Sequence, residues 1–385
     1  MTDARAPDET VLITPEGIDL GVLTQWQLIR LRFARHRLAL VSLIALCIIY
    51  ALALFADFMA PVGQNERNMN FIFAPPQLPH FNFEDGLHTY AISNHISPTN
   101  LKNFYVEHSD LKVPLGFFVR SEPYRLLGLV PFEHRFFGVD YERLAESDHG
   151  PSPAEATFFL FGSDRYGHDI WSRIIHGARI SLSIGLAGIS VTFLVGVIIG
   201  GISGYVGGSI DNLIQRTIEI INAFPQLPLW IAIAAILPKD WSPLQVYFAI
   251  TVVLSALNWT WLARVVRGKI LSLREEDYAV AARLLGAGHA RVIFRHLVPG
   301  FTSHIIVTLT LSVPGMILGE TALSFLGLGL RAPVVSWGVM LQDCFNLEVV
   351  ANYPWLLMPV VFIVMTVLAF NFLGDGLRDA ADPYS

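Results

Sequence analysis

Long apolar runs without charged side chains constrain this fold more than any other feature of the sequence. The first, residues 38–55, contains no Asp, Glu, Lys or Arg and follows a flank that carries Arg35 and Arg37. A run of about 20 apolar residues can cross a bilayer as a helix, and a basic flank favours the cytoplasmic side. Over the whole chain, 53% of residues are hydrophobic and only 15% are charged. We therefore expect an all-α membrane protein that crosses the bilayer several times.

Six runs of this kind give a consistent topology. We expect six transmembrane helices, at 38–60, 180–202, 220–237, 244–262, 301–319 and 354–373. Basic residues concentrate in the short segment after 262, beginning with Arg264 and Arg267. Because short cytoplasmic loops carry an excess of Lys and Arg, this segment and both termini are predicted to lie in the cytoplasm. Gly196 and Gly200 in the second run form a GxxxG pair, which permits close approach of a neighbouring helix.

Some residues in or beside the runs are candidates for a pathway or gate. Pro225 and Pro228 interrupt the third run, and Pro314 lies near the far end of the fifth. Prolines within a span are tolerated where neighbouring groups or a cavity satisfy the freed carbonyls, so a kinked pore-lining helix and a merely bent helix both stay open. Glu320 follows the fifth run. An ionisable group near the membrane is a functional candidate, and a helix-end carboxylate that reaches water is an equally simple alternative.

The polar segment 61–160 separates the first two runs and has no apolar stretch long enough to span a membrane. We expect a small extracytoplasmic domain of mixed or β-rich character, with short strands at 117–119 and 136–139. A long, partly disordered loop is the alternative. The predicted organisation is a cytoplasmic tail at 1–37, a first helix at 38–60, the inserted domain at 61–160 and a five-helix core at 161–385.

The segment 275–299, EEDYAVAARLLGAGHARVIFRHLVP, is the most densely charged interior part of the chain. Gly286 can end a first helix, because glycine tolerates the left-handed conformation found at helix ends. A second amphipathic helix would follow, with Arg291 and Arg295 on its polar side and Pro299 at its end. The first helix has apolar residues at three- and four-residue spacing, which predicts one small-residue face formed by Tyr278, Ala281, Ala282 and Leu285. The pattern predicts a helix pair on the cytoplasmic side that docks on another protein.

Several kinds of chemistry have no support in the sequence. It contains no GxxxxGK[ST] motif, so this chain is not expected to hold ATP by itself. Cys47 and Cys344 form no CxxC motif or Cys/His cluster, and a net charge of -6 with scattered basic residues gives no nucleic-acid footprint. Asp164 and its neighbours resemble a metal cluster at first sight, but pairing with Arg173 or Arg179 is the simpler interpretation. We expect no catalytic site, metal or cofactor in this chain.

Four stretches together resemble a known family. The EAA loop of bacterial ABC importer permeases runs Glu-Ala-Ala, three residues, Gly, and then a stretch that ends in Leu-Pro; Ala281, Ala282, Gly286 and Pro299 fall on this pattern. Val280 stands at the position of the glutamate. Three further stretches are similar to the C-type permease of the dipeptide, oligopeptide and nickel branch: FGSDRYGHDIWSRIIHGARISL from Phe161, ETALSFLGLGLRAPVVSWGVML from Glu320 and VLAFNFLGDGLRDAADP from Val367.

The resemblance implies a type I importer permease in the inner membrane of a bacterial cell. Its expected partners are a B-type permease subunit, two cytoplasmic ATPase subunits that bind ATP-Mg, and an extracytoplasmic substrate-binding protein. The segment 265–300 would be the coupling loop. The residues expected to contribute to ATPase coupling are Tyr278, Ala281, Ala282, Gly286, Arg291, Arg295 and Pro299.

Peptides or peptide-like solutes are the substrates that the resemblance implies, and oligosaccharides or another small solute are the alternative. The inserted domain is longer than in ordinary members, so no role carries over to it. A stand-alone secondary transporter is the alternative from another class. It would place charged residues near span centres for ion coupling and show an inverted repeat, and the sequence suggests neither.

Overall fold

The first apolar run forms a helix whose start is fixed by a side-chain cap. The computed structural model describes residues 25–98, 103–146, 151–152, 155–238 and 240–381 of the 385-residue chain. Helix α1 (Gln25–Arg35) leads into α2 (Arg37–Leu54), and α3 (Ala56–Met59) follows. Between α1 and α2, His36 accepts a hydrogen bond from the backbone N–H of Ala39 at 3.1 Å. This cap satisfies one of the N–H groups that a helix start leaves unpaired.

The described chain has five helical segments that are long and apolar enough to cross a membrane: Arg37–Leu54, Ile170–Val206, Pro243–Leu273, His289–Phe325 and Pro354–Ala381. A sixth crossing arises if α6 (Gly208–Asn222) and α7 (Gln226–Ala235) form one span, which is then bent by 83°. The predicted multi-pass, mostly helical architecture is confirmed, with five or six crossings. The remaining long helices are α5 (Ile170–Val206), α8 (Pro243–Leu273), α11 (Thr302–Phe325) and α14 (Met358–Ala381).

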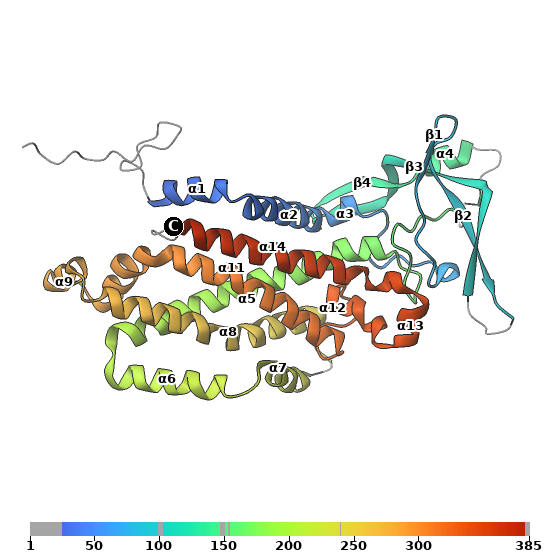
Figure 1. The fold of residues 1–385 in the computed structure, drawn as a ribbon. Helices are drawn as coiled ribbons and strands as arrows, with labels where there is room; N and C mark the ends of the chain where they lie inside the picture. The colour runs from blue at the N-terminus through green and yellow to red at the C-terminus, as the bar shows by residue number, and fades with distance from the viewer. Residues whose placement is uncertain (1–24, 99–102, 147–150, 153–154, 239, 382–385) are drawn as a thin grey trace, which may run out of the picture.

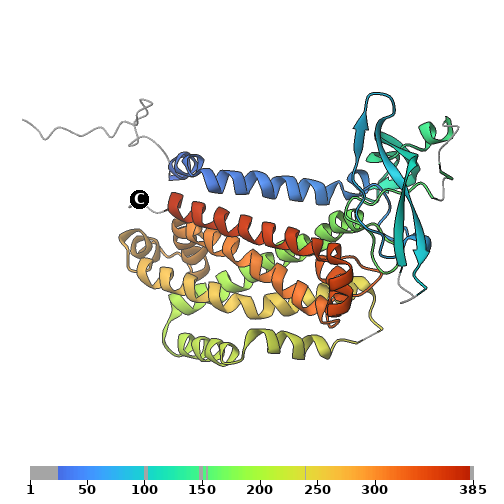
Figure 2. The same cartoon turned by 45° about the vertical axis from the view of Figure 1, so that its right-hand side comes forward.

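Short elements connect the spans at the two ends of the bundle. One end has α9 (Asp277–Leu284), α10 (His289–Arg291), the π-helical η3 (Val292–Leu297) and the 3₁₀ turn η4 (Val298–Phe301). The other end has α12 (Trp337–Met340), η5 (Leu341–Phe345), α13 (Leu347–Asn352) and η6 (Pro354–Leu357). Figures 1 and 2 show α9, the start of α1 and the end of α14 at one end of the bundle, with the β-sheet at the opposite end.

The observed helices differ from the predicted runs in two ways. The segment 204–216, an expected short loop between the predicted second and third spans, is almost entirely helical, and the predicted third span at 220–237 falls on two helices. In the second and fourth runs, the helices continue well beyond the apolar residues, to Ile170 and Leu273. The reason is that polar side chains in these extensions are satisfied within the bundle. Asp211 on α6, for example, is paired with Arg267 on α8.

Helices α5 and α8 approach each other through a row of glycines on α5. A Cβ atom on Gly200 would lie 2.4 Å from the carbonyl oxygen of Ala263, and one on Gly204 would lie 2.8 Å from that of Arg267. A Cβ on Gly196 would lie 2.9 Å from the Leu262 side chain. The predicted role of the Gly196–Gly200 pair in close packing is confirmed, and the row continues to Gly204.

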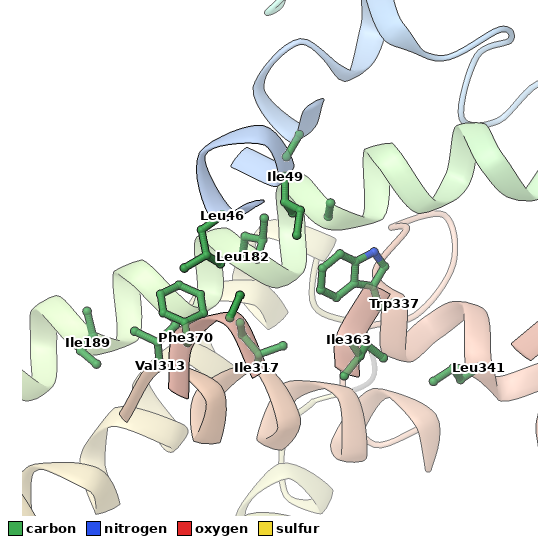
Figure 3. Close-up of a cluster of buried hydrophobic side chains, with 13 residues drawn as sticks. Leu46, Ile49, Leu182, Ile189, Val313, Ile317, Trp337, Leu341, Ile363 and Phe370 are labelled. Carbon is green, nitrogen blue, oxygen red and sulfur yellow. The ribbon is translucent and has the colours of Figure 1, made fainter. Parts of the chain in front are cut away.

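A large buried cluster joins the first span to the rest of the bundle (Figure 3). It includes Trp337, which is fully buried and donates from Nε1 to the carbonyl of Ile174 at 3.1 Å. α2, α5, α11 and α14 contribute the surrounding side chains, which include Leu46, Ile49, Leu182, Val313, Ile317, Ile363 and Phe370. Burial of apolar side chains from four helices holds the first span against the core.

The inserted segment is rich in strands. Its four-stranded antiparallel sheet has the order β1-β2-β3-β4, and a short helix, α4 (Tyr141–Glu146), follows. The predicted strands at 117–119 and 136–139 lie in β3 and β4, where Phe117 pairs with Phe137. This agrees with the expected β-rich character. The bounds are β1 (His80–Asn82), β2 (Gly86–Ile96), β3 (Asn103–Leu126) and β4 (Val130–Val139), with a 3₁₀ turn, η2 (Met69–Phe71), before β1.

Polar contacts attach this sheet domain to the bundle. Asp57 on α3 pairs with Arg179 on α5 at 3.1 Å and lies 3.3 Å from His176 Nε2. Burial acts to raise the pKa of Asp57, but hydrogen bonds from His176 and Arg179 outweigh it and hold that pKa well below its usual value. Arg135 on β4 donates to the carbonyl of Ala60 at 2.9 Å. The junction therefore depends on directional hydrogen bonds to charged groups.

The Asp164 group has the structural role expected from the sequence. Asp164 pairs with Arg173 at 2.7 Å and with His168 at 2.8 Å. The other predicted partner, Arg179, instead pairs with Asp57. Nowhere in the described ranges are three or more His, Cys, Asp or Glu side chains grouped so as to hold a metal ion.

Candidate coupling surface and pathway

The helix α9 ends where the sequence predicts, at a glycine turn. Gly286 has a φ of +82°, and its N–H donates to the carbonyl of Arg283 at 2.9 Å. The N–H of Ala287 donates to the carbonyl of Ala282 at 3.0 Å. These two bonds form a Schellman motif, in which a left-handed residue closes the last turn of a helix. The predicted helix break at Gly286 is confirmed.

One side of α9 packs on the bundle and the other is exposed. Ala279 and Ala282 are buried in a cluster with Val266 and Ile270 of α8 and Leu297 of η3. The opposite side exposes Tyr278, Ala281, Leu284 and Leu285, and the two leucines are 83% and 89% exposed. We call these four residues the α9 face. The predicted single face that combined Tyr278 and Ala281 with Ala282 is wrong, because Ala282 points into the bundle.

The second helix of the pair begins at His289 and leads directly into α11. Val292, Ile293 and Leu297 are buried, while Arg291 and Arg295 are exposed, as the amphipathic pattern predicts. Pro299 does not end the helix: it lies in η4, and α11 begins at Thr302. The π-helical and 3₁₀ segments before it change the backbone hydrogen-bond pattern, so the missing N–H of proline is accommodated without a stop.

Ion pairs and hydrogen bonds tie this end of the bundle together. Asp211 on α6 accepts two hydrogen bonds of 2.6 Å from Arg267 on α8 and one of 2.5 Å from Ser203 on α5. At the end of α8, Arg274 donates to the carbonyl of Gly204 at 3.2 Å, and Arg283 of α9 donates to the carbonyl of Arg274 at 3.2 Å. Through Arg283, α9 is therefore bonded to the end of α8, which is in turn joined to α5 and α6.

The break between α6 and α7 borders a polar cavity of about 380 Å³. Pro225 precedes the first residue of α7, and Pro228 lies in its first turn, where backbone N–H groups have no partner within the helix. Amide side chains line the cavity: Gln226 donates to Asn258 at 3.1 Å, and Asn222 accepts from Thr260 at 3.1 Å. The other lining residues include Phe224, Leu257, Trp261 and Arg264.

Sequence reasoning selected the prolines at this break and missed the amides. The signal was present, because Asn222, Gln226 and Asn258 are polar residues in or beside apolar runs. The prolines shape the backbone, and the amides supply the donors and acceptors.

The two other pathway candidates lie within α11. Pro314 is buried inside the helix, which continues without interruption. Glu320 is fully buried and accepts hydrogen bonds from three hydroxyls: Ser181 at 3.0 Å, Ser324 at 2.8 Å and Ser336 at 2.7 Å. The simple alternative, a helix-end carboxylate that reaches water, is therefore wrong. Glu320 links α5, α11 and the segment before α12.

Two family models match parts of this chain. Residues 196–384 match the family model of the binding-protein-dependent transport system inner membrane component. Residues 24–76 match the model of the N-terminal TM domain of oligopeptide transport permease C. A crystal structure of an amino acid ABC transporter with histidines matches 54% of this chain and 94% of its own chain at 18% identity, with a TM-score of 0.37.

Among curated relatives, the oligopeptide transport system permease protein OppC of Bacillus subtilis (strain 168) is 41% identical over 66% of this chain and 80% of its own length. The dipeptide transport system permease protein DppC of the same organism is 41% identical over 58% and 68%. The glutathione transport system permease protein GsiD of Pectobacterium atrosepticum is 38% identical over 66% and 80%. The chain therefore belongs to the family of binding-protein-dependent transport system inner membrane components, as an ABC permease of the OppC/DppC type.

Proposed function

We propose that this chain is the permease subunit of an ABC importer for peptides or peptide-like solutes, and that it forms half of the translocation pathway. A B-type permease subunit would form the other half. Relatives named for oligopeptide, dipeptide and glutathione transport support the substrate class. The observation that carries the proposal is the α9 face, an exposed apolar surface on a short helix that is itself fixed to the bundle.

The α9 face has the properties of a docking element. Leu284 and Leu285 are almost fully exposed at the tip of α9, and burial of one such side chain contributes about 1.5–3 kcal/mol. Arg291 and Arg295 are also exposed and have no ion-pair partner in the part of the chain that the structure describes. In the proposed complex, a cytoplasmic ATPase receives the leucines in an apolar groove and faces the arginines with acidic groups. Since Val280 replaces the glutamate of the EAA pattern, apolar contact carries the docking.

The packing behind α9 gives a route from the ATPase to the spans. Ala279 and Ala282 lie against Val266 and Ile270 of α8 and against Leu297, which leads into α11. Two partner ATPases that bind ATP-Mg and close on each other would move α9, and α8 and α11 would tilt with it. Rigid-body movement of this kind is a common way to alternate between inward-open and outward-open states.

The amide-lined cavity supports a peptide substrate. Asn222, Gln226 and Asn258 offer donors and acceptors beside the apolar side chains of Phe224 and Leu257. Such a surface suits an extended peptide, which carries amide groups along its backbone and apolar side chains between them. In the proposed assembly, α9 and both termini lie in the cytoplasm. The sheet domain then lies outside, where a substrate-binding protein delivers the solute.

Replacement of the two exposed leucines tests the coupling proposal. In the complete transporter, Leu284→Asp and Leu285→Asp should each weaken co-purification of the ATPase subunits by roughly 10- to 100-fold, the equivalent of one lost leucine contact. Leu347→Asp is a matched control, because Leu347 is also 83% exposed but lies on α13 at the opposite end. Unchanged ATPase binding in both α9 variants would refute the docking model.

Uptake measurements test the substrate. Proteoliposomes that contain the transporter, its ATPases and its binding protein should accumulate labelled di- and oligopeptides on addition of ATP. Asn258→Leu should reduce this uptake and leave ATPase co-purification intact, because Asn258 lines the cavity and lies outside the α9 face. Accumulation of oligosaccharides in place of peptides would overturn the substrate class and leave the permease assignment untouched.

A further inference from the structure

The turn between β3 and β4 is apolar and exposed, which is unusual for a loop in an extracytoplasmic domain. From Arg125 to Glu133 the sequence is RLLGLVPFE, with no charge between those two residues. Residues 126–130 are called the hairpin tip. Leu127 and Val130 are exposed and Leu129 is 81% exposed. Turn segments in water are usually built from polar residues, glycine and proline, so this tip calls for an apolar environment.

Contacts with α3 fix the hairpin tip at the end of the first span. The backbone N–H of Leu127 donates to Asp57 Oδ2 at 3.4 Å. Phe58 packs against Phe118, Phe132 and Phe136 of the hairpin, with ring centroids 5.9–6.0 Å apart. Figure 1 shows β4 reaching the end of α2 beside α3. The tip is therefore held close to the point where the first span leaves the bilayer.

The surface beside the hairpin tip is the exposed face of α2. Val41, Ile44, Ile48 and Leu54 are exposed along the whole helix, which is the pattern expected of a helix that faces lipid. The 18 residues of α2 rise about 27 Å, slightly less than the hydrocarbon thickness of about 30 Å. The length of α2 is close to the thickness of the hydrocarbon layer, so Leu54 and the neighbouring hairpin tip lie near the outer boundary of that layer.

We propose that the hairpin tip inserts into the outer leaflet of the bilayer, as a second membrane contact of the sheet domain. Leu127, Leu129 and Val130 lie among acyl chains, and Phe117 and Phe118, which are also exposed, occupy the interfacial region that aromatic rings favour. Arg125, next to the tip, is exposed and would contact lipid phosphates, whereas Arg120 pairs with Glu133 at 3.6 Å. The contact fixes the tilt of the sheet relative to the membrane.

A lipid environment fits these observations better than a protein partner. The exposed side chains of the tip carry no hydrogen-bond donor or acceptor, and the tip contacts α3, the short helix that directly follows the apolar α2 in the chain. A protein partner that covered the tip would shield it from lipid and water alike. The two occupants are therefore distinguished by accessibility.

Spin labels at selected cysteines measure that accessibility. In a background with Cys47→Ala and Cys344→Ala, the complete transporter is labelled at Leu129→Cys and, separately, at Val130→Cys, and is reconstituted in phospholipid nanodiscs. Power saturation then compares oxygen, which partitions into lipid, with a water-soluble nickel chelate. Ile44→Cys on α2 is the lipid reference. Phe83→Cys is the water reference, because Phe83 is apolar and 99% exposed on the β1–β2 turn, away from the bundle in Figures 1 and 2.

The labels at positions 129 and 130 are expected to resemble the one at 44, with high accessibility to oxygen and at least severalfold less accessibility to the chelate than the label at 83. Accessibility to the chelate equal to that at position 83 would show that the tip lies in water and would overturn the proposal. Protection from both reagents would show a protein contact and would overturn it equally.

Discussion

At the α9 end of the bundle, the buried side of a short helix packs through small apolar side chains, whereas at the other end the junction of the sheet domain adds hydrogen bonds of charged groups to its aromatic contacts. The methyl side chains of Ala279 and Ala282 cannot form hydrogen bonds, and they pack in an apolar cluster with residues of α8 and η3. Asp57 and Arg135, in contrast, make directional hydrogen bonds to Arg179 and to the carbonyl of Ala60. Both ends expose leucines, but the segments that carry these leucines are attached to the bundle by different kinds of contact.

The difference matters for what each end can do. Close packing of small side chains transmits a displacement from one rigid helix to the next, because a packed core has little compressibility. Hydrogen bonds of fixed geometry hold an orientation instead, which suits a domain that must keep one tilt relative to the bilayer. The contrast predicts that substitutions can disrupt ATPase coupling at the α9 end without loosening the sheet domain, and the reverse.

The largest effect is expected from a charge placed under α9. Ala279→Glu buries a carboxylate in an apolar cluster with no basic partner, which costs several kcal/mol. We expect α9 to detach, the thermal unfolding temperature to fall, and ATPase co-purification to be lost. Ala281→Glu is the matched variant, because Ala281 lies two residues away and is exposed. It should weaken ATPase binding with no change in the unfolding temperature; equal destabilisation by both variants would contradict the described packing.

An intermediate effect is expected at the polar junction. Asp57→Asn leaves Arg179 without its carboxylate, and the loss of hydrogen bonds to a charged group costs about 1.5–3 kcal/mol. Hydrogen exchange should become faster in β3 and β4 and stay unchanged in α9. Asp85→Asn is the control, since the Asp85–Lys112 pair lies on the surface of the same sheet, where ion pairs contribute little. Faster exchange in α9 would show that the two ends are not independent.

The pKa of Asp57 gives the same junction a pH dependence. Hydrogen bonds from His176 and Arg179 hold the pKa of Asp57 below its usual value in the folded protein. A carboxyl group whose pKa is lowered by folding adds stability above its unfolded pKa and loses it as the pH falls toward the folded value. The contribution of the Asp57 carboxylate should therefore be fully present at neutral pH and be lost only in strong acid, which the free energy of unfolding measured against pH would show.

The sequence predicts local features at the α9 end well, because their signals lie within a few residues. The Gly286 turn and the exposed Arg291 and Arg295 follow from spacing and from glycine chemistry alone. The buried side of α9 does not, since Ala281 and Ala282 are chemically identical and only their position relative to α8 separates them. The position of α9 relative to α8 therefore divides residues that helical periodicity had placed on one face.

The sheet and the broken span were harder to predict, because their partners are distant in the sequence. Strand character at 117–119 was visible, but the pairing of Phe117 with Phe137 depends on the whole register of β3 and β4. The helix α6 was missed because Asp211 suggests a loop until its partner, Arg267, is known. Apolar runs therefore locate the five unbroken spans and say little about the broken one or about the polar residues that pair around it.

The smallest effect on stability, and the most specific effect on coupling, is expected at the turn after α9. Gly286 and Gly288 both have open space around them, so a larger side chain would clash at neither site. Only Gly286 has a left-handed backbone, with a φ of +82°, whereas Gly288 has a φ of -68°. A side chain in the left-handed region costs about 1–2 kcal/mol, and more for a β-branched residue. Gly286→Val should therefore strain the Schellman turn, and Gly288→Val should not.

This pair of variants separates the geometry of the turn from its bulk. Both should insert into the membrane and assemble with normal yield. In Gly286→Val, the exposed leucines would be displaced at the tip of α9, so ATP hydrolysis should continue while uptake falls by roughly tenfold, in line with the cost of the strained turn. Gly288→Val adds the same side chain on the same loop and should keep uptake near normal. If the two variants transport equally well, the angle set at Gly286 has no part in coupling, and contact by Leu284 and Leu285 alone carries it.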